Sequence, residues 1–207
     1  MNHVINVVTD AAGRGRGAPV TAIATAATAA TPPAALTAPE LAHAYCGLMS
    51  GFPTGVAVVT SAAADGEPFG LTCSSLTSVT LAPPTLLVCI GLHSRTLAAI
   101  RGLGAFGVNL LHARGRRAAE VFASPGPDRF GAVAWEPHGR DGVPRLTDDT
   151  LGFACCDLAE LRTVGDHALV VGRVAEVLYT PDTPLLYGLR RFAAWQPDNL
   201  EEPTCVS

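Results

Sequence analysis

Residues 55–80 read GVAVVTSAAADGEPFGLTCSSLTSVT, and this stretch decides the predicted fold. Its two halves, 55–61 and 69–80, are rich in β-branched and apolar residues, which favour strands. Asp65-Gly66 between them is typical of a tight hairpin turn. The sequence therefore predicts two antiparallel strands joined by a short turn.

Similar signals continue along the chain. Strands are predicted over 85–90, 106–110, 151–161, 167–178 and 185–192, with Gly165-Asp166 joining the 151–161 and 167–178 pair. Helices are predicted over 38–49, 96–102 and 114–122. Strands this numerous, joined mostly by hairpins, predict a mainly β fold, a closed or nearly closed antiparallel barrel with a few short helices.

The folded domain is predicted to begin at residue 37, where Thr37 and Glu40 match the capping-box pattern of a helix start. Residues 18–38 contain ten Ala, five Thr and three Pro, a composition with few large side chains to bury. We expect residues 1–36 to form a disordered Ala/Thr-rich tail, residues 37–197 one folded domain, and residues 198–207 a C-terminal tail.

The composition excludes several classes of protein. Fourteen basic and eighteen acidic residues give a formal net charge of −4, and no basic block is available for nucleic acid. All the basic residues are Arg, so no Lys can form a Schiff base. No apolar run approaches the ~20 residues that a membrane span requires. The six cysteines form no C-x-x-C pair, and the six histidines lack metal-ligand spacing. We expect a cytoplasmic protein with small buried cysteines, no metal site, and no nucleic-acid or membrane partner.

Three polar segments are candidate binding sites, since no G-x-G-x-x-G lies between a strand and a helix and no established catalytic motif is present. In residues 72–78, each buried hydroxyl needs a partner or costs ~1–3 kcal/mol. A polar ligand would supply partners there, and a solvated edge strand is the alternative. Ser94-Arg95-Thr96 at a helix start suits a phosphate group, although a plain N-cap explains Ser94 equally well. Gly165-Asp166-His167 is either a solvated turn or part of a ligand site.

Seven motifs follow one another in a fixed order: FPTGV (52–56) with VVTS (58–61), GLTCSSLTSV (70–79), APP (82–84), Ser94-x-Thr96, FGVNLL (106–111), Arg129-Phe130 and GDH (165–167). In this order they resemble the flavin reductase family with the FMN-binding split-barrel fold. Members of this family are the reductase components of two-component flavin-dependent monooxygenases. The chain departs from the family at Leu76, where Phe is frequent, and at Gly91-Leu92-His93, where many members carry Asn and Lys or Arg.

The resemblance implies a set of site residues. A flavin, FAD or FMN, would bind at a dimer interface, with Ser94, Arg95 and Thr96 at its phosphate. Phe130 would pack near the far end of the cofactor. His167 would lie beside the nicotinamide of NADH or NADPH and orient it, with Gly165 and Asp166 in the same turn. The residues expected around the isoalloxazine ring are Thr54, Gly55, Thr72, Cys73, Ser74, Ser75 and Leu76.

The resemblance also implies an activity. The protein is expected to be a homodimeric NAD(P)H:flavin oxidoreductase that transfers hydride from nicotinamide C4 to flavin N5. It would supply the reduced flavin to a separate monooxygenase component. Two alternatives stay open on the sequence: an oxidoreductase that retains FMN and reduces another acceptor, and a flavin-binding or carrier protein without turnover.

Overall fold

The computed structural model describes residues 36–126 and 128–196 of the 207-residue chain. The chain divides after Thr37, and every helix and strand named below belongs to Ala38–Ser207. Apart from Leu36, the two predicted tails lie outside the described residues. In the described part of the chain, no helix is long and apolar enough to cross a membrane.

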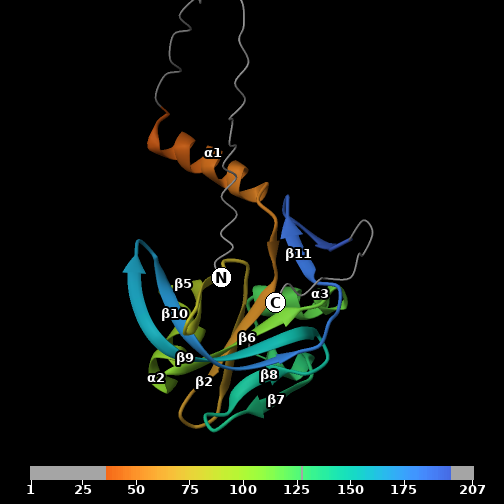
Figure 1. Ribbon diagram of the computed structural model, residues 1–207. Coiled ribbons are helices and arrows are strands. Elements are labelled where there is room, and N and C mark those ends of the chain that lie inside the picture. The colour runs from red at the N-terminus through yellow and green to blue at the C-terminus, as the bar shows by residue number, and fades with distance from the viewer. Residues whose placement is uncertain (1–35, 127, 197–207) are drawn as a thin grey trace, which may run out of the picture. The chain divides into compact units, whose positions relative to one another are not determined.

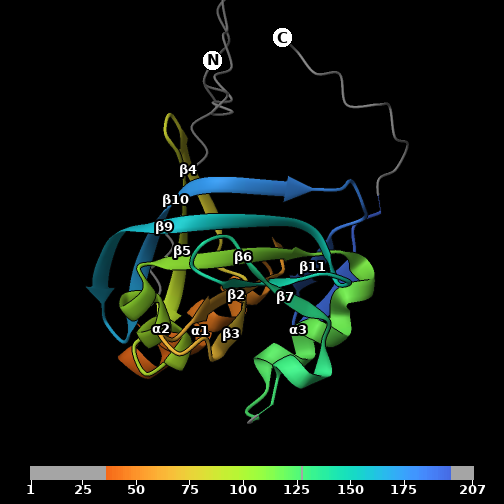
Figure 2. The same cartoon turned by 90° about the horizontal axis from the view of Figure 1, so that it is seen from below.

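Seven strands form the main sheet in the order β3-β2-β6-β9-β10-β5-β4, and all neighbours are antiparallel (Figures 1 and 2). The predicted mainly β, antiparallel fold is confirmed. The long β9–β10 hairpin turns at Gly165-Asp166, as the sequence predicts. The strands are β2 (Ala57–Ala62), β3 (Pro68–Cys73), β4 (Thr77–Leu81), β5 (Pro84–Gly91), β6 (Ala105–Leu111), β9 (Thr150–Val164) and β10 (His167–Tyr179).

Two smaller sheets complete the β structure. β1 (Thr54–Gly55), β11 (Leu185–Gly188) and β12 (Arg191–Ala194) form one of them, in the order β1-β11-β12. β7 (Trp135–His138) pairs with β8 (Val143–Leu146) in the other. The first of these sheets positions the site, because it aligns Thr54 with Tyr187.

All three predicted helices form, with small shifts at their ends. They are α1 (Ala38–Ser50), α2 (Arg95–Leu103) and α3 (Arg116–Ala123). α2 and α3 both pack against β3, which lies between them in Figure 2. Leu97 and Ile100 anchor α2 in the core, and Phe122 anchors α3. α1 differs from both, since none of its residues is buried.

A buried amide ties the main sheet to the β7–β8 hairpin. Asn109 on β6 is fully buried and donates hydrogen bonds to the carbonyl of Val58 (3.1 Å) and the hydroxyl of Thr60 (3.1 Å). Its side-chain oxygen accepts a hydrogen bond from the backbone N–H of Leu146 on β8 (2.8 Å). Since a buried polar group without partners costs free energy, these bonds specify how the hairpin docks. The asparagine of FGVNLL is therefore structural.

Two predicted strands are wrong in detail. Residues 69–80 form two strands, β3 and β4, that pair with different neighbours. Between these two strands, the side chain of Ser75 forms hydrogen bonds with the backbone of Cys89 in β5, where a strand residue would use its own backbone. Its hydroxyl accepts from the N–H of Cys89 (2.9 Å) and contacts the carbonyl oxygen of Cys89 (3.2 Å). Residues 185–192 form a hairpin, with Leu189 and Arg190 in left-handed conformation at its turn (φ 49° and 59°).

The β7–β8 hairpin is absent from the prediction. Pro137 and Pro144 face each other in it, and proline inside a strand argues against a strand assignment. The hairpin is a separate two-stranded sheet, so both of its strands are edge strands, in which proline is tolerated.

The cysteines are only partly buried. All five described cysteines are free, and Cys73 and Cys156 are buried as predicted. Burial raises the pKa of the Cys156 thiol to about 12. Cys89 and Cys155 are half-buried, and Cys46 is exposed because α1 buries nothing. The prediction of a buried side chain is wrong for Cys46, and Cys205 lies outside the described residues.

Candidate functional site

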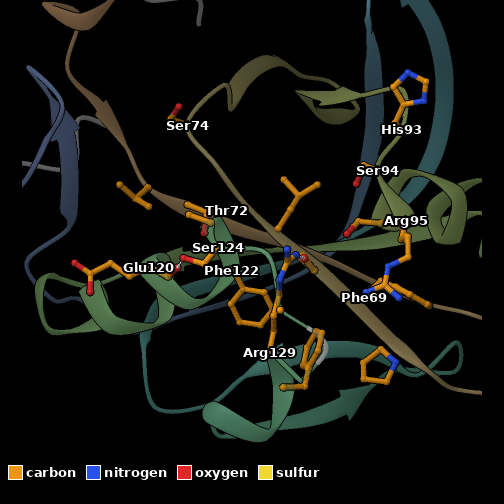
Figure 3. Close-up of a pocket in the computed structure, with 18 of the residues that line it drawn as sticks. Phe69, Thr72, Ser74, His93, Ser94, Arg95, Glu120, Phe122, Ser124 and Arg129 are labelled. Atoms are coloured by element: carbon orange, nitrogen blue, oxygen red, sulfur yellow. Dashed lines mark hydrogen bonds between the residues drawn. The ribbon is translucent and has the colours of Figure 1, made fainter.

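A cavity of about 740 Å³ lies over β3. Its floor includes Phe69, Gly70 and Thr72 of β3. Figure 3 shows Ser94 and Arg95, at the start of α2, on one side of it. Phe122 and Ser124, at the end of α3, lie with Arg129 on the other side. The ends of two helices and strand β3 therefore line a space of the size typical of small-molecule sites.

The α2 side of this cavity is suited to an anion. Ser94 is the N-cap residue of α2, but its side chain makes no capping hydrogen bond, so its hydroxyl is available to a ligand. Thr96 lies in the first turn and is 3% exposed. The first backbone N–H groups of a helix have no partner within it and carry partial positive charge. Ser94 and Thr96 both line the cavity at this helix start.

Arg95 adds a full positive charge to the same side. Its guanidinium lies over the ring of Phe69, 5.4 Å from the ring centroid. Within the described residues, Arg95 forms no ion pair. An unpaired guanidinium beside a helix N-terminus is an arrangement that binds phosphate groups.

A second, smaller cavity of about 300 Å³ shares Ser74 and Tyr187 with the first. Its wall combines polar and apolar groups, among them Thr54, Ser75 and Leu76. Further apolar wall comes from the end of α1 and the segment after it, through Met49 and Phe52. Because the two cavities have common walls, one elongated ligand could occupy both.

The predicted site residues fall into three groups. Thr72, Ser74, Ser94, Arg95, Thr96 and Phe130 line the larger cavity. Thr54, Ser75 and Leu76 line the smaller one, together with Ser74. Gly55 and Cys73 line neither cavity: Gly55 pairs with Leu186, and the side chain of Cys73 belongs to the hydrophobic core. Burial raises the pKa of the Cys73 thiol, which is typical of an inert side chain.

The hydroxyl of Thr72 already has a partner. It donates to the carbonyl of Ala119 in α3 at 2.6 Å and so joins β3 to that helix. Thr72 therefore shapes the wall of the larger cavity, while Ser74, which is exposed, lines both cavities.

Residues 49–196 match the family described as Flavin reductase like domain. The chain belongs to the flavin reductase family. It is 58% identical over 151 residues to the "Flavin reductase (NADPH)" of Lentzea aerocolonigenes, covering 73% of this chain and 88% of the relative. It is 44% identical over 153 residues to the "Flavin reductase (NADH)" of Kitasatospora aureofaciens, covering 73% of this chain and 80% of the relative.

A solved flavin reductase structure has the same fold. The NADH:FAD oxidoreductase SgcE6 of Streptomyces globisporus, in complex with NAD and FAD fragments, superposes with a TM-score of 0.72 at 32% identity. The match covers 80% of this chain and 99% of SgcE6. The predicted split-barrel fold class is therefore confirmed.

In this flavin reductase domain, the turn Gly165-Asp166-His167 lies next to the loop that leads into α2. The N–H of Leu92 donates to the carbonyl of Asp166 (2.9 Å), and His167 pairs with Gly91 across the sheet. His167 Nδ1 is 2.7 Å from the Asp166 carboxylate, and this hydrogen bond holds the pKa of Asp166 below its ordinary value. None of the three residues lines either cavity, so the turn stands beside the site.

Sequence reasoning missed several residues that line the two cavities. Tyr187 forms part of both cavities, and Phe122 and Arg129 line the larger one. Arg129 is half of the Arg129-Phe130 motif, of which only Phe130 was given a role. No local signal identifies Tyr187, because it reaches the site through pairing with Thr54.

Proposed function

We propose that this protein is an NAD(P)H-dependent flavin reductase that supplies reduced FAD or FMN to a partner flavin-dependent monooxygenase. The observation that carries the proposal is the uncommitted Ser94 hydroxyl at the start of α2, beside Thr96 and the unpaired Arg95. Together with the adjoining smaller cavity, it provides an anion site next to a site with polar and apolar walls. A flavin nucleotide has both parts.

Each group of residues would bind one part of the flavin. Ser94, Thr96 and the first amides of α2 would donate hydrogen bonds to the phosphate, and Arg95 would balance its charge. Thr54 and residues 74–76 would border the isoalloxazine ring. Because Thr54, Ser74 and Ser75 are small and carry hydroxyls, they allow close approach to the edge of the ring, and Leu76 would supply an apolar contact. Cys73 would contribute through packing beneath the site.

A bound flavin supplies the hydride acceptor, and the nicotinamide supplies the hydride. The task of the chain is therefore to bind and align the two molecules, and alignment alone can lower a barrier by roughly 7–11 kcal/mol. No general acid or base is needed for the transfer itself. The hydroxyl and guanidinium groups that line the larger cavity are accordingly suited to binding the two molecules.

His167 would orient the nicotinamide. Since the Asp166 carboxylate can only accept, the neutral imidazole carries its proton on Nδ1. Nε2 is then left as an acceptor, which suits the N–H₂ group of the nicotinamide carboxamide. Gly165 permits the turn, with φ of 58°.

The protein would act as a homodimer. Leu41, Tyr45 and Leu48 of α1 are large apolar residues that remain exposed, Leu48 by 72%. The end of α1 also forms a wall of the smaller cavity through Met49. A second copy that covered α1 would bury this apolar surface and close the cavity from that side. Sedimentation at working concentration tests this, and a monomer would contradict it.

A partner monooxygenase is supported by relatives of this chain. The Rhodococcus opacus protein named as the reductase component of a 4-nitrophenol monooxygenase is 38% identical over 146 residues, covering 70% of this chain and 77% of that protein.

Free cysteines are also typical of the reducing cytoplasm, which we propose as the location.

Steady-state oxidation of NADH and NADPH by the purified full chain tests the proposal. The rate is expected to rise and saturate as FMN or FAD is added. Turnover that needs another acceptor and ignores added flavin would contradict a supply function. Binding of flavin without any NAD(P)H oxidation would contradict enzymatic activity.

A further inference from the structure

Tyr187 lies where the two cavities meet. Among the described residues, Ser74 and Tyr187 are the two that line both cavities. The side chain of Tyr187 is 37% exposed, and its hydroxyl forms no hydrogen bond within the described part of the chain. A flavin with its ring in the smaller cavity and its phosphate in the larger one would pass this side chain. The orientation of the Tyr187 ring therefore affects how such a ligand is aligned.

The backbone of Tyr187 is fixed by the segment before β2. Tyr187 pairs with Thr54 of β1 across the small sheet. The next residue, Gly188, lies close to Pro53, because a Cβ at this glycine would be 3.2 Å from the Cα and Cβ of the proline. These contacts place the strand, but they leave the orientation of the Tyr187 ring to its side-chain neighbours.

The Tyr187 ring packs on Phe192, which is directly opposite it in β12. The two ring centroids are 5.2 Å apart and the ring planes are inclined by 57°. Phe192 is half-buried, lines the larger cavity and packs against the core cluster that contains Phe122. Aromatic pairs across two strands stabilise each other. Phe192 therefore supports the Tyr187 ring on the side of the larger cavity.

Arg116, the first residue of α3, holds Phe192 in turn. The hairpin of β11 and β12 lies beside α3 in both views of the structure (Figures 1 and 2). The guanidinium of Arg116 lies over the ring of Phe192, 5.7 Å from its centroid, and a cation in this position is attracted to the ring. Its Nε also donates to the carboxylate of Glu120 at 2.8 Å, which keeps the guanidinium in place. Arg116 itself lines neither cavity, so it reaches them only through these two neighbours.

We propose that Tyr187 contacts the flavin where the two cavities meet, and that Arg116 is a positioning residue that holds the Tyr187 ring through Phe192. This inference rests on the proposed function, and it adds to the site a residue that lies outside both cavities. Without Arg116, the rings of Phe192 and Tyr187 have more orientations available. The flavin is then bound less tightly and is less well aligned for hydride transfer.

The fluorescence of riboflavin bound to the flavin-free full chain tests the proposal. A phenol in contact with an excited flavin quenches its fluorescence by donating an electron, whereas the ring of phenylalanine does not. Tyr187→Phe should therefore raise the fluorescence of the bound flavin while it keeps a ring that packs on Phe192. Arg116→Met should raise it by less, because Tyr187 then contacts the flavin for part of the time. The dissociation constant of riboflavin should rise about two- to fivefold in Arg116→Met, the factor that an exposed cation–π contact contributes.

Arg117→Met is the matched control, because Arg117 is the neighbouring exposed arginine of α3 and lines neither cavity. It removes the same charge and should leave both the fluorescence and the riboflavin affinity as in the wild type. Riboflavin is uncharged, so the release of Glu120 from its ion pair cannot weaken binding by repulsion. Equal effects of Arg116→Met and Arg117→Met would overturn the proposal, since charge alone would explain them. Unchanged fluorescence in Tyr187→Phe or in Arg116→Met would overturn it as well.

A double variant tests whether Arg116 acts through Tyr187. Combined with Tyr187→Phe, Arg116→Met should leave the fluorescence of the bound flavin unchanged, because no phenol remains to be positioned. A further rise as large as that caused by Arg116→Met alone would overturn the proposal. If Tyr187→Phe fails to fold, the comparison of Arg116→Met with Arg117→Met still decides, because both change exposed residues.

The wild type separates this inference from the function on which it rests. If the wild type oxidises NAD(P)H with added flavin but the variants fail these tests, the inference falls and the flavin reductase function stands. If the wild type neither binds nor reduces flavin, the proposed function itself fails.

Discussion

Replacing Ser94 by alanine removes one hydroxyl from the proposed phosphate site and leaves the helix intact. An N-cap serine usually contributes ~1 kcal/mol through its side chain. In α2, however, the Ser94 side chain makes no capping hydrogen bond. Ser94→Ala should therefore keep the thermal stability of the protein, so that any loss of binding belongs to the ligand. Thr96→Val removes the neighbouring hydroxyl with little change in shape.

The magnitude follows from the charge of the ligand. A hydrogen bond to a charged group contributes about 1.5–3 kcal/mol, which corresponds to about a 10- to 100-fold change in the dissociation constant. We expect a weakening in this range for FMN in each variant. Riboflavin lacks the phosphate, so its affinity should change by less than about twofold.

Fluorescence titration of riboflavin and FMN measures both constants on the same protein. Ser78→Ala is the matched control, because Ser78 is an exposed serine of β4 that lines neither cavity. Equal losses for FMN and riboflavin would refute the reasoning, since the hydroxyl would then act on the ring or on the fold. Unchanged FMN affinity would refute it as well.

Three further predictions concern the turn, the thiols and the core. His167→Ala is expected to raise the KM for NAD(P)H more than the dissociation constant of flavin, because its imidazole faces the loop beside the cavity and not the cavity itself. In a Cys205→Ser variant at neutral pH, a thiol reagent should label exposed Cys46 quickly. Cys156 should react only after unfolding, because its pKa of about 12 keeps the thiol protonated and burial blocks access. Asn109→Leu should lower the free energy of unfolding by about 3 kcal/mol in urea denaturation, because it leaves the Leu146 N–H without its partner in the core.

Each of these predictions has a result that would contradict it. Equal effects of His167→Ala on flavin and NAD(P)H would remove its orienting role. Rapid labelling of Cys156 in the folded protein would show that the strand around it opens readily. Asn109→Leu as stable as Ser78→Ala would mean that the amide network contributes nothing to docking of the β7–β8 hairpin.

Local signals explain which elements the sequence predicts well. Asp65-Gly66 and Gly165-Asp166 are turn sequences with strands on both sides, and both hairpins form where they indicate. The two central turn residues, Leu189 and Arg190, are not glycine, asparagine or aspartate, so residues 185–192 resemble one strand. The break between β3 and β4 depends on Ser75 meeting Cys89, a tertiary contact that the pattern of residues 69–80 does not contain.

For the candidate site, too, the sequence predicts what depends on neighbouring residues and misses what depends on tertiary contacts. Ser94-Arg95-Thr96 is predictable because residue type and helix start coincide within three positions. Arg129 is held in the cavity wall by a hydrogen bond to the carbonyl of Gly70, which is 59 positions away in the chain. Tyr187 is placed at the cavities by its pairing with Thr54 between β1 and β11. Sequence reasoning therefore finds the α2 side of the larger cavity and misses much of the opposite wall.

Reduction of excess flavin by a small amount of protein, without oxygen, tests the central claim most directly. The full chain is mixed with NADPH or NADH and a large molar excess of FAD or FMN, and the absorbance of oxidised flavin is followed. We predict that all of the flavin becomes reduced, so that each protomer turns over many free flavin molecules. Reduction that stops at one flavin per protomer, or that never starts, would contradict the account.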